Sequence, residues 1–169
     1  IGVINLAKHE TLVQELYCIE TLARVDVLCL DKTGTITEGK MFVEGYQSNI
    51  SNFKEIMSNL TYDLQDDNPT INAIREYFKP KSTFYLRKTI PFNSSNKFSG
   101  VIYEDNTYLI GAYNYMIKEF DLNVLKEIEE HASKGYRVIS VTKTTSSHIN
   151  FDHLEFVGNI YLLDKIREE

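Results

Sequence analysis

The residues best suited to chemistry lie in a polar run that follows an apolar segment. The run begins at Asp31 in the string VDVLCLDKTGTITEG, residues 25–39. A carboxylate such as that of Asp31 can bind Mg²⁺ or attack a phosphoryl group. Lys32 adds positive charge, Thr33 and Thr35 add hydroxyl donors, and the backbone N–H groups of a glycine-containing turn can bind phosphate oxygens. The short pattern D-K-x-G is also found in ordinary turns, so on its own it leaves both interpretations open.

The residues before Asp31 indicate how this loop is positioned. Residues 25–30 are apolar except for Asp26, which predicts a short parallel strand covered on both faces. Apolar side chains at helical spacing predict an amphipathic helix over residues 11–22. Ligands of open α/β sheets bind at the carboxyl ends of parallel strands. We therefore expect a ligand site at Asp31.

The full string DKTGTIT, residues 31–37, resembles the phosphorylation signature of P-type ATPases, ion pumps that form an aspartyl-phosphate during transport. Residues 12–30 are similar to the segment that leads into this signature in bacterial cation pumps. The resemblance implies that Asp31 accepts the γ-phosphate of ATP, with Lys32 and Thr33 beside it in the catalytic loop. It also implies that Mg²⁺ is bound by Asp31 and by the main-chain carbonyl of Thr33.

Two alternatives of other classes are considered. One is a free-standing haloacid-dehalogenase-like phosphatase, which usually carries a second Asp two positions after the nucleophile. Thr33 stands there in this chain, and a hydroxyl is a poor general acid or base near neutral pH, so an acyl-phosphate would persist. The other is a nucleotide-binding module without catalysis. The signature favours the pump.

The residues after the signature resemble the nucleotide domain that the family inserts there. The resemblance implies that Phe92, in the segment PFNSSNK, stacks on adenine, and that Arg137 reaches the phosphates. Ile110 replaces a family lysine and Ile71 stands where the family often has Glu, which predicts weak, near-millimolar binding. The implied nucleotide-binding residues are Thr70, Phe92, Ser94, Lys97, Gly111, Ala112 and Arg137.

The order of elements predicts an α/β protein whose insert is of the α+β type. Helices are expected from residues 52, 69 and 121, and strands over residues 84–90, 97–104, 107–110, 137–142 and 155–163. A two-residue turn, Asp105-Asn106, joins two of these strands, and residues 143–150 are expected to form a mobile loop. The fold expected is an antiparallel sheet flanked by helices, inserted into a partial haloacid-dehalogenase-like Rossmann-type phosphorylation domain.

The predicted domains are residues 1–39 for the start of the phosphorylation domain, 40–157 for the nucleotide-binding domain, and 158–169 for the hinge and re-entry. The last segment contains D-x-x-R, which resembles the family hinge. The chain has no starting Met and lacks the later G-D-G-x-N-D motif of the family. It is therefore interpreted as a cytoplasmic part of an integral cell-membrane pump, whose other domains, membrane helices and transported cation are its partners.

Charge and the positions of Cys, His and Asp residues argue against several other partners and sites. The net charge of −6 gives no basic surface and argues against nucleic acid as a partner. Cys18 and Cys29 lie in apolar segments and are expected to be reduced core thiols. The four His residues have no convergent spacing for zinc. The carboxylates Asp63, Asp66 and Asp67 lack the EF-hand pattern and are expected in a solvated loop.

Overall fold

The structure is a computed structural model that describes residues 2–15, 17–145 and 153–167. The chain divides into two compact units, residues 1–36 and 37–169, which are described separately. Among the described residues, no helix combines the length and the apolar character needed to cross a membrane.

The first unit has little regular structure. It contains α1 (Gly2–Lys8), α2 (Tyr17–Leu22) and a single π-helical turn, η1 (Lys32–Ile36). The expected helix over residues 11–22 is therefore reduced to its last six residues, and α1 was not predicted. Neither α1 nor α2 buries a side chain, and helices this short gain little stability without tertiary packing.

The parallel strand predicted for residues 25–30 is absent, so that prediction is wrong for this structure. The segment is irregular, and Val27 and Leu28 are 74% and 71% exposed. A strand needs a neighbour for its backbone hydrogen bonds, and every described strand belongs to the sheet of the second unit. Cys18, in α2, and Cys29 are both free and exposed, so the prediction that they are core thiols is wrong for this structure.

The second unit is built on one six-stranded sheet in the order β1-β6-β5-β4-β3-β2, in which every neighbouring pair is antiparallel. The strands are β1 (Thr37–Ser48), β2 (Leu86–Asn93), β3 (Phe98–Tyr103), β4 (Thr107–Gly111), β5 (Arg137–Thr144) and β6 (Glu155–Ile166). The antiparallel sheet flanked by helices was predicted and is confirmed.

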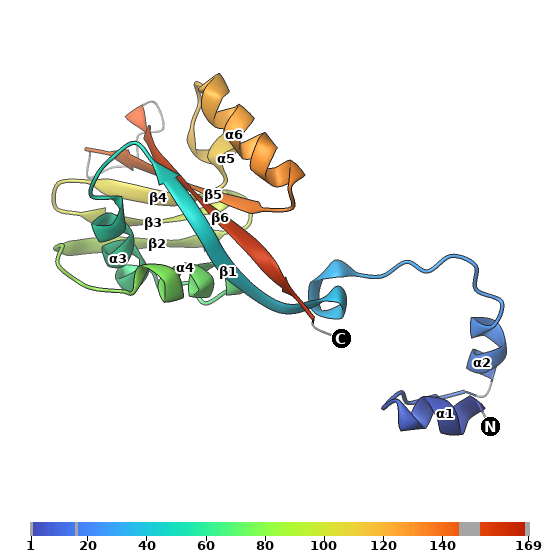
Figure 1. Cartoon of the computed structure of the whole chain (residues 1–169). Helices are drawn as coiled ribbons and strands as arrows, with labels where there is room; N and C mark the ends of the chain where they lie inside the picture. Colours follow the sequence, from blue (N-terminus) through green and yellow to red (C-terminus); the bar gives the residue numbers. More distant parts are fainter. Residues whose placement is uncertain (1, 16, 146–152, 168–169) are drawn as a thin grey trace. The chain divides into compact units, whose positions relative to one another are not determined.

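Helices cover both faces of the sheet (Figure 1). One face carries α3 (Phe53–Asp63) and α4 (Pro69–Phe78), and the other carries α5 (Tyr113–Met116) and α6 (Leu122–Ser133). The predicted starts of α4 and α6 are confirmed by their caps. The Asn68 side chain accepts a hydrogen bond from the Ile71 N–H, and the Asp121 side chain accepts one from the Asn123 N–H.

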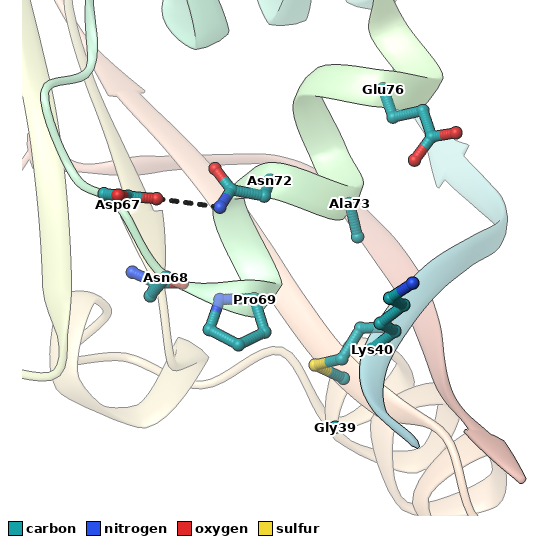
Figure 2. Close-up of a pocket in the computed structure, with 9 residues that line it drawn as sticks. Gly39, Lys40, Asp67, Asn68, Pro69, Asn72, Ala73 and Glu76 are labelled. Carbon is teal, nitrogen blue, oxygen red and sulfur yellow. Dashed lines mark hydrogen bonds between the residues drawn. The ribbon is translucent and has the colours of Figure 1, made fainter. Parts of the chain in front are cut away.

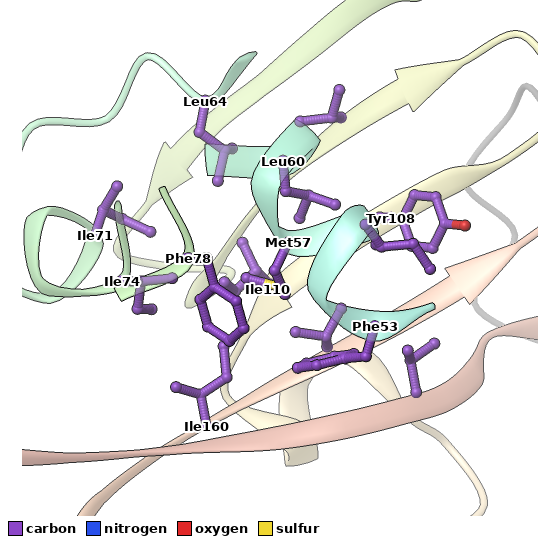
Figure 3. Packing of buried hydrophobic residues seen from close by; sticks show 14 of the residues in the cluster. Phe53, Met57, Leu60, Leu64, Ile71, Ile74, Phe78, Tyr108, Ile110 and Ile160 are labelled. Carbon is purple, nitrogen blue, oxygen red and sulfur yellow. The ribbon is translucent and has the colours of Figure 1, made fainter. Parts of the chain in front are cut away.

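The main core lies between the sheet and the pair α3 and α4 (Figure 3). Helical spacing places Phe53, Ile56, Met57 and Leu60 on the inner side of α3, where each is at most 1% exposed. Strand residues meet them by two-residue alternation, so Tyr108 and Ile110 of β4 face this core while Leu109 packs on the opposite face.

The structure differs from the predicted elements in detail. The strand β1 and the helix α5 were not predicted, and the β3–β4 hairpin has three linking residues, 104–106, rather than two. Most of the expected mobile loop lies outside the described residues. The strand β6 runs unbroken across the predicted boundary at residues 157 and 158, and the three-domain division remains a prediction.

Candidate functional site

The antiparallel topology gathers the predicted nucleotide residues at one end of the sheet. Because neighbouring strands run in opposite directions, the ends of β2 and β4 and the beginnings of β3 and β5 lie on the same side. Phe92 is the penultimate residue of β2, Lys97 precedes β3, Gly111 ends β4 and Arg137 begins β5. These residues form the candidate site, although 45 positions separate the first from the last.

Lys97, Gly111 and Ala112 are in direct contact. The Ala112 N–H donates to the Lys97 carbonyl oxygen over 3.0 Å. A Cβ atom on Gly111 would lie 2.3 Å from that same oxygen and 2.6 Å from Phe98 Cα, so only glycine fits without a backbone shift. The left-handed conformation of Lys97, with φ of 59°, closes the turn that contains Ser94. Lys97 and Ser94 are exposed.

Arg137 and Thr70 are joined across the sheet end. Arg137 Nη1 donates to Thr70 Oγ1 over 3.1 Å. Arg137 shares its side of β5 with Ile139 and Val141, which pack into the core beneath α3 and α4. The Thr70 hydroxyl in turn donates to Met41 Sδ over 3.5 Å. Arg137 has five N–H donors, so this one bond leaves most of its donors available to an anionic ligand.

Phe92 lies in a bulge of the edge strand. Ile90 pairs with Gly100 and Asn93 pairs with Phe98, so Pro91 and Phe92 together lie opposite Ser99. The Phe92 N–H donates to Asp66 Oδ1 over 2.9 Å. Phe92 is 49% exposed, so a ligand can reach this residue.

Sequence reasoning missed Asp66, because it placed three carboxylates together in a solvated loop. Asp67 is exposed, but Asp66 bonds to Phe92 and Asp63 is 9% exposed. Tyr103 Oη donates to Asp63 Oδ2 over 2.9 Å. Helical spacing from Ile56 and Leu60 could have identified Asp63 as inward-facing, whereas no local signal identifies Asp66.

A pocket of about 360 Å³ opens between the start of β1 and the first turns of α4 (Figure 2). Its lining includes Lys40, Asp67, Glu76 and the side chain of Asn72, which donates to Asp67 Oδ1 over 2.8 Å. Two carboxylates and one amine give this pocket no excess of positive charge, so its lining is poorly suited to phosphate groups.

Two positions that depart from the family pattern are buried. Ile110 is 2% exposed and Ile71 is 5% exposed, and both belong to the main core. Their side chains therefore contribute to packing. The charged contact that a lysine at position 110 could make is absent from this chain.

The Asp31 loop lies in the first unit. Asp31 is exposed, and Lys32 and Thr33 begin η1, in which Gly34 has a φ of +84°. The Asp31 carboxylate and the main-chain carbonyl of Thr33 are hard oxygen donors of the kind that Mg²⁺ prefers. The described residues contain no cluster of three or more His, Cys, Asp or Glu side chains that could hold a metal ion.

Solved structures share the fold. A crystal structure of a zinc-transporting PIB-type ATPase in the E2.Pi state aligns with 98% of this chain and 26% of its own chain, at a TM-score of 0.62 and 22% identity. The catalytic domain of the CPx-ATPase CopB-B, studied for its conformational changes upon nucleotide binding, aligns with 94% of this chain and 51% of its own, at a TM-score of 0.60 and 14% identity. The sheet with its flanking helices thus has the fold of the P-type ATPase nucleotide-binding domain.

Sequence comparison gives the same family. The probable cation-transporting ATPase exp7 of Streptococcus pneumoniae serotype 4 is 34% identical over 181 residues, covering 99% of this chain and 22% of the relative. The calcium-transporting ATPase CtpE of Mycolicibacterium smegmatis is 36% identical over 141 residues, covering 82% and 18%. No family model matches the chain. The chain is homologous to cation-transporting P-type ATPases and spans about a fifth of the length of these relatives.

Proposed function

We propose that residues 37–169 bind ATP at the sheet end formed by β2, β3, β4 and β5. The observation that carries the proposal is the convergence of Phe92, Lys97, Gly111 and Arg137, together with Thr70, at this one end. The site combines an exposed aromatic ring, two cationic side chains and a backbone that a ligand can approach closely. These are the features that a planar base with a phosphate chain requires.

Each residue has a distinct role in the proposed complex. The exposed ring of Phe92 stacks on adenine, and the Gly111–Ala112 turn lies along the edge of the base. Lys97 and Arg137 bind the anionic phosphates, with Ser94 as a neighbouring hydroxyl donor. Thr70 orients Arg137 through the hydrogen bond between them.

In the complete protein, Asp31 is proposed to accept the γ-phosphoryl group of this ATP. A carboxylate oxygen of Asp31 attacks the γ-phosphorus, the bond to the β–γ bridging oxygen breaks, and ADP leaves with that oxygen. Lys32 offsets the negative charge of the transferring group. A bound Mg²⁺ would neutralise phosphate charge at the same loop. Thr33 is a poor proton-transfer group near neutral pH, so the acyl-phosphate persists long enough to drive a conformational change.

The phosphoryl transfer to Asp31 implies a domain organisation, partners and a location for the complete protein. Residues 1–39 are proposed to begin a haloacid-dehalogenase-like phosphorylation domain, residues 40–157 to form the nucleotide-binding domain, and residues 158–169 to be the hinge. The partners are the other domains and membrane helices of a cation pump and the cation that it transports. The site would then lie on the cytoplasmic side of the cell membrane.

The proposal is tested by titrating the ¹⁵N-labelled chain with ATP, with tripolyphosphate as a control ligand. Binding at this site moves the amide resonances of residues 92–97, 111–112 and 137 saturably, with near-millimolar affinity, or about 4 kcal/mol. Tripolyphosphate leaves residues 111–112 unaffected because it has no base. Shifts confined to other elements, or no saturable shifts, would contradict the proposal.

A further inference from the structure

The hydrogen bond between Asp66 and Phe92 joins two segments that are distant in the sequence. Asp66 lies in the loop between α3 and α4, and Phe92 lies in the bulge of β2. The bond uses Asp66 Oδ1 only. The second oxygen, Oδ2, is shielded from solvent and has no hydrogen-bond partner among the described residues. The bond between Oδ1 and the Phe92 N–H is itself exposed, so its contribution comes from holding two distant segments together with a charged acceptor rather than from exclusion of water.

The loop that carries Asp66 is fixed on both sides by α4. Arg75 donates from Nε to the Thr61 carbonyl over 3.1 Å and from Nη2 to the Leu64 carbonyl. After Asp66, the Asn68 side chain caps α4 at Ile71. The carboxylate is therefore anchored to the helix pair that covers the main core.

Phe92, by contrast, has little support from its own strand. β2 is an edge strand, and Pro91 beside Phe92 has no N–H to donate. The bulge removes Phe92 from the regular pairing that holds Ile90 and Asn93. The backbone of Phe92 therefore depends on Asp66 for a fixed position.

We infer that Asp66 is the positioning residue for Phe92 and that it presents the exposed ring in the orientation that stacks on a base. The inference rests on the proposed function and adds a residue to that site. Asp66 itself acts through the Phe92 backbone, so its removal costs affinity by allowing the ring to sample unproductive positions before binding.

A double-mutant cycle measured by ATP titration of the ¹⁵N-labelled 169-residue chain tests this inference. Asp66→Ala should weaken ATP binding about threefold to tenfold. Asp66→Asn should retain most of the affinity, because the amide oxygen can still accept the Phe92 N–H. In a Phe92→Ala background, Asp66→Ala should have no further effect, since the group that it positions is gone.

A second readout follows the bond directly. The Phe92 amide proton should move to lower chemical shift in Asp66→Ala, and less so in Asp66→Asn, with or without nucleotide. Asp105→Ala is the matched control, because it removes an exposed carboxylate from the hairpin at the opposite end of the sheet. It should change neither the Phe92 resonance nor the affinity.

The outcomes separate this inference from the proposed function. If Phe92→Ala weakens ATP binding but Asp66→Ala does not, or if Asp66→Ala weakens it equally without Phe92, the positioning role is wrong and the site stands. If the unaltered chain shows no saturable binding, or Phe92→Ala binds as tightly as the unaltered chain, the proposed site fails and the inference fails with it.

Discussion

Arg137 and Thr70 are 67 positions apart in the sequence, yet Arg137 Nη1 lies 3.1 Å from Thr70 Oγ1. Four residues before Thr70, Asp66 holds the Phe92 backbone. The stretch 66–70 thus contacts both β5 and β2, which are three strand spacings, or about 14 Å, apart. The start of α4 therefore ties together the aromatic and cationic parts of the candidate site.

Arg137→Ala should separate phosphate recognition from base recognition. If Arg137 binds phosphate, the affinity for ATP falls about tenfold, since a hydrogen bond to a charged group contributes about 1.5–3 kcal/mol and exposure reduces this value. The affinity for adenosine should not change. Both are measured by NMR titration, with Arg87→Ala as a control that removes an exposed arginine from the far end of β2. Equal losses for ATP and adenosine would contradict the assignment.

Phe92→Ala should weaken the binding of both ATP and adenosine. Stacking of a base on an aromatic side chain contributes about 1–3 kcal/mol, so we expect a loss of about tenfold or more. Phe120→Ala is the matched control, because Phe120 is 46% exposed against 49% for Phe92 and belongs to no part of the site. Similar losses in the two variants would show that the effect is not specific to the site.

Gly111→Ala tests the close approach of two strands at the site. The added methyl group would lie 2.3 Å from the Lys97 carbonyl oxygen, so the backbone must move. We expect the free energy of unfolding to fall by about 1–3 kcal/mol in urea denaturation. Gly45→Ala, where no atom lies within 4 Å of the added group, should change it by less than about 0.5 kcal/mol. A fully stable Gly111→Ala variant would show that the turn adapts without cost.

The second unit could be predicted well because its signals are local. The inner face of α3 repeats at helical spacing, and Asn68-Pro69 marks the start of α4. The strand β1 was missed because Phe42, which faces solvent, and Gly45 interrupt its alternation. β1 pairs with β6, whose residues lie more than 100 positions away in the sequence. A local sequence pattern cannot predict such a distant pairing.

In the first unit, by contrast, the sequence pattern predicted structure that the chain does not form. Residues 25–30 have the apolar character of a buried strand, but character alone supplies no hydrogen-bonding neighbour. Likewise, the family motifs name Phe92, Arg137 and Thr70 separately, but they indicate neither the hydrogen bond between Arg137 and Thr70 nor the contact of Asp66 with Phe92. Residue types indicate a site, and tertiary contacts decide how its parts are held.

Stability should fall at alkaline pH because of Tyr103. Burial, followed by its hydrogen bond to Asp63, raises the pKa of Tyr103 well above its usual value. The unfolded chain releases this proton near pH 10 while the folded chain keeps it, so the free energy of unfolding decreases as pH rises above about 10. The slope is at most about 1.4 kcal/mol per pH unit for one tyrosine.

Tyr103→Phe removes this contribution and should flatten the pH dependence measured by urea denaturation above about pH 9. It also leaves the buried Asp63 carboxylate without this donor, which should cost about 1–3 kcal/mol near neutral pH. Tyr85→Phe is the control, since Tyr85 is 75% exposed. A pH dependence unchanged by Tyr103→Phe would show that Tyr103 does not keep its proton in the folded chain.

Asp31→Asn, made in the complete protein, tests the proposed phosphoryl transfer. The amide cannot serve as the carboxylate nucleophile, so acid-stable incorporation of phosphate from γ-labelled ATP should be abolished. Nucleotide binding should be retained, because the residues proposed to hold the base and the phosphate chain belong to the other unit. Asp26→Asn, five residues earlier in the same exposed segment, is the matched control and should label normally. Labelling of Asp31→Asn at the level of the unaltered protein would remove Asp31 as the nucleophile, whereas loss of labelling in both variants would point to disruption of the segment.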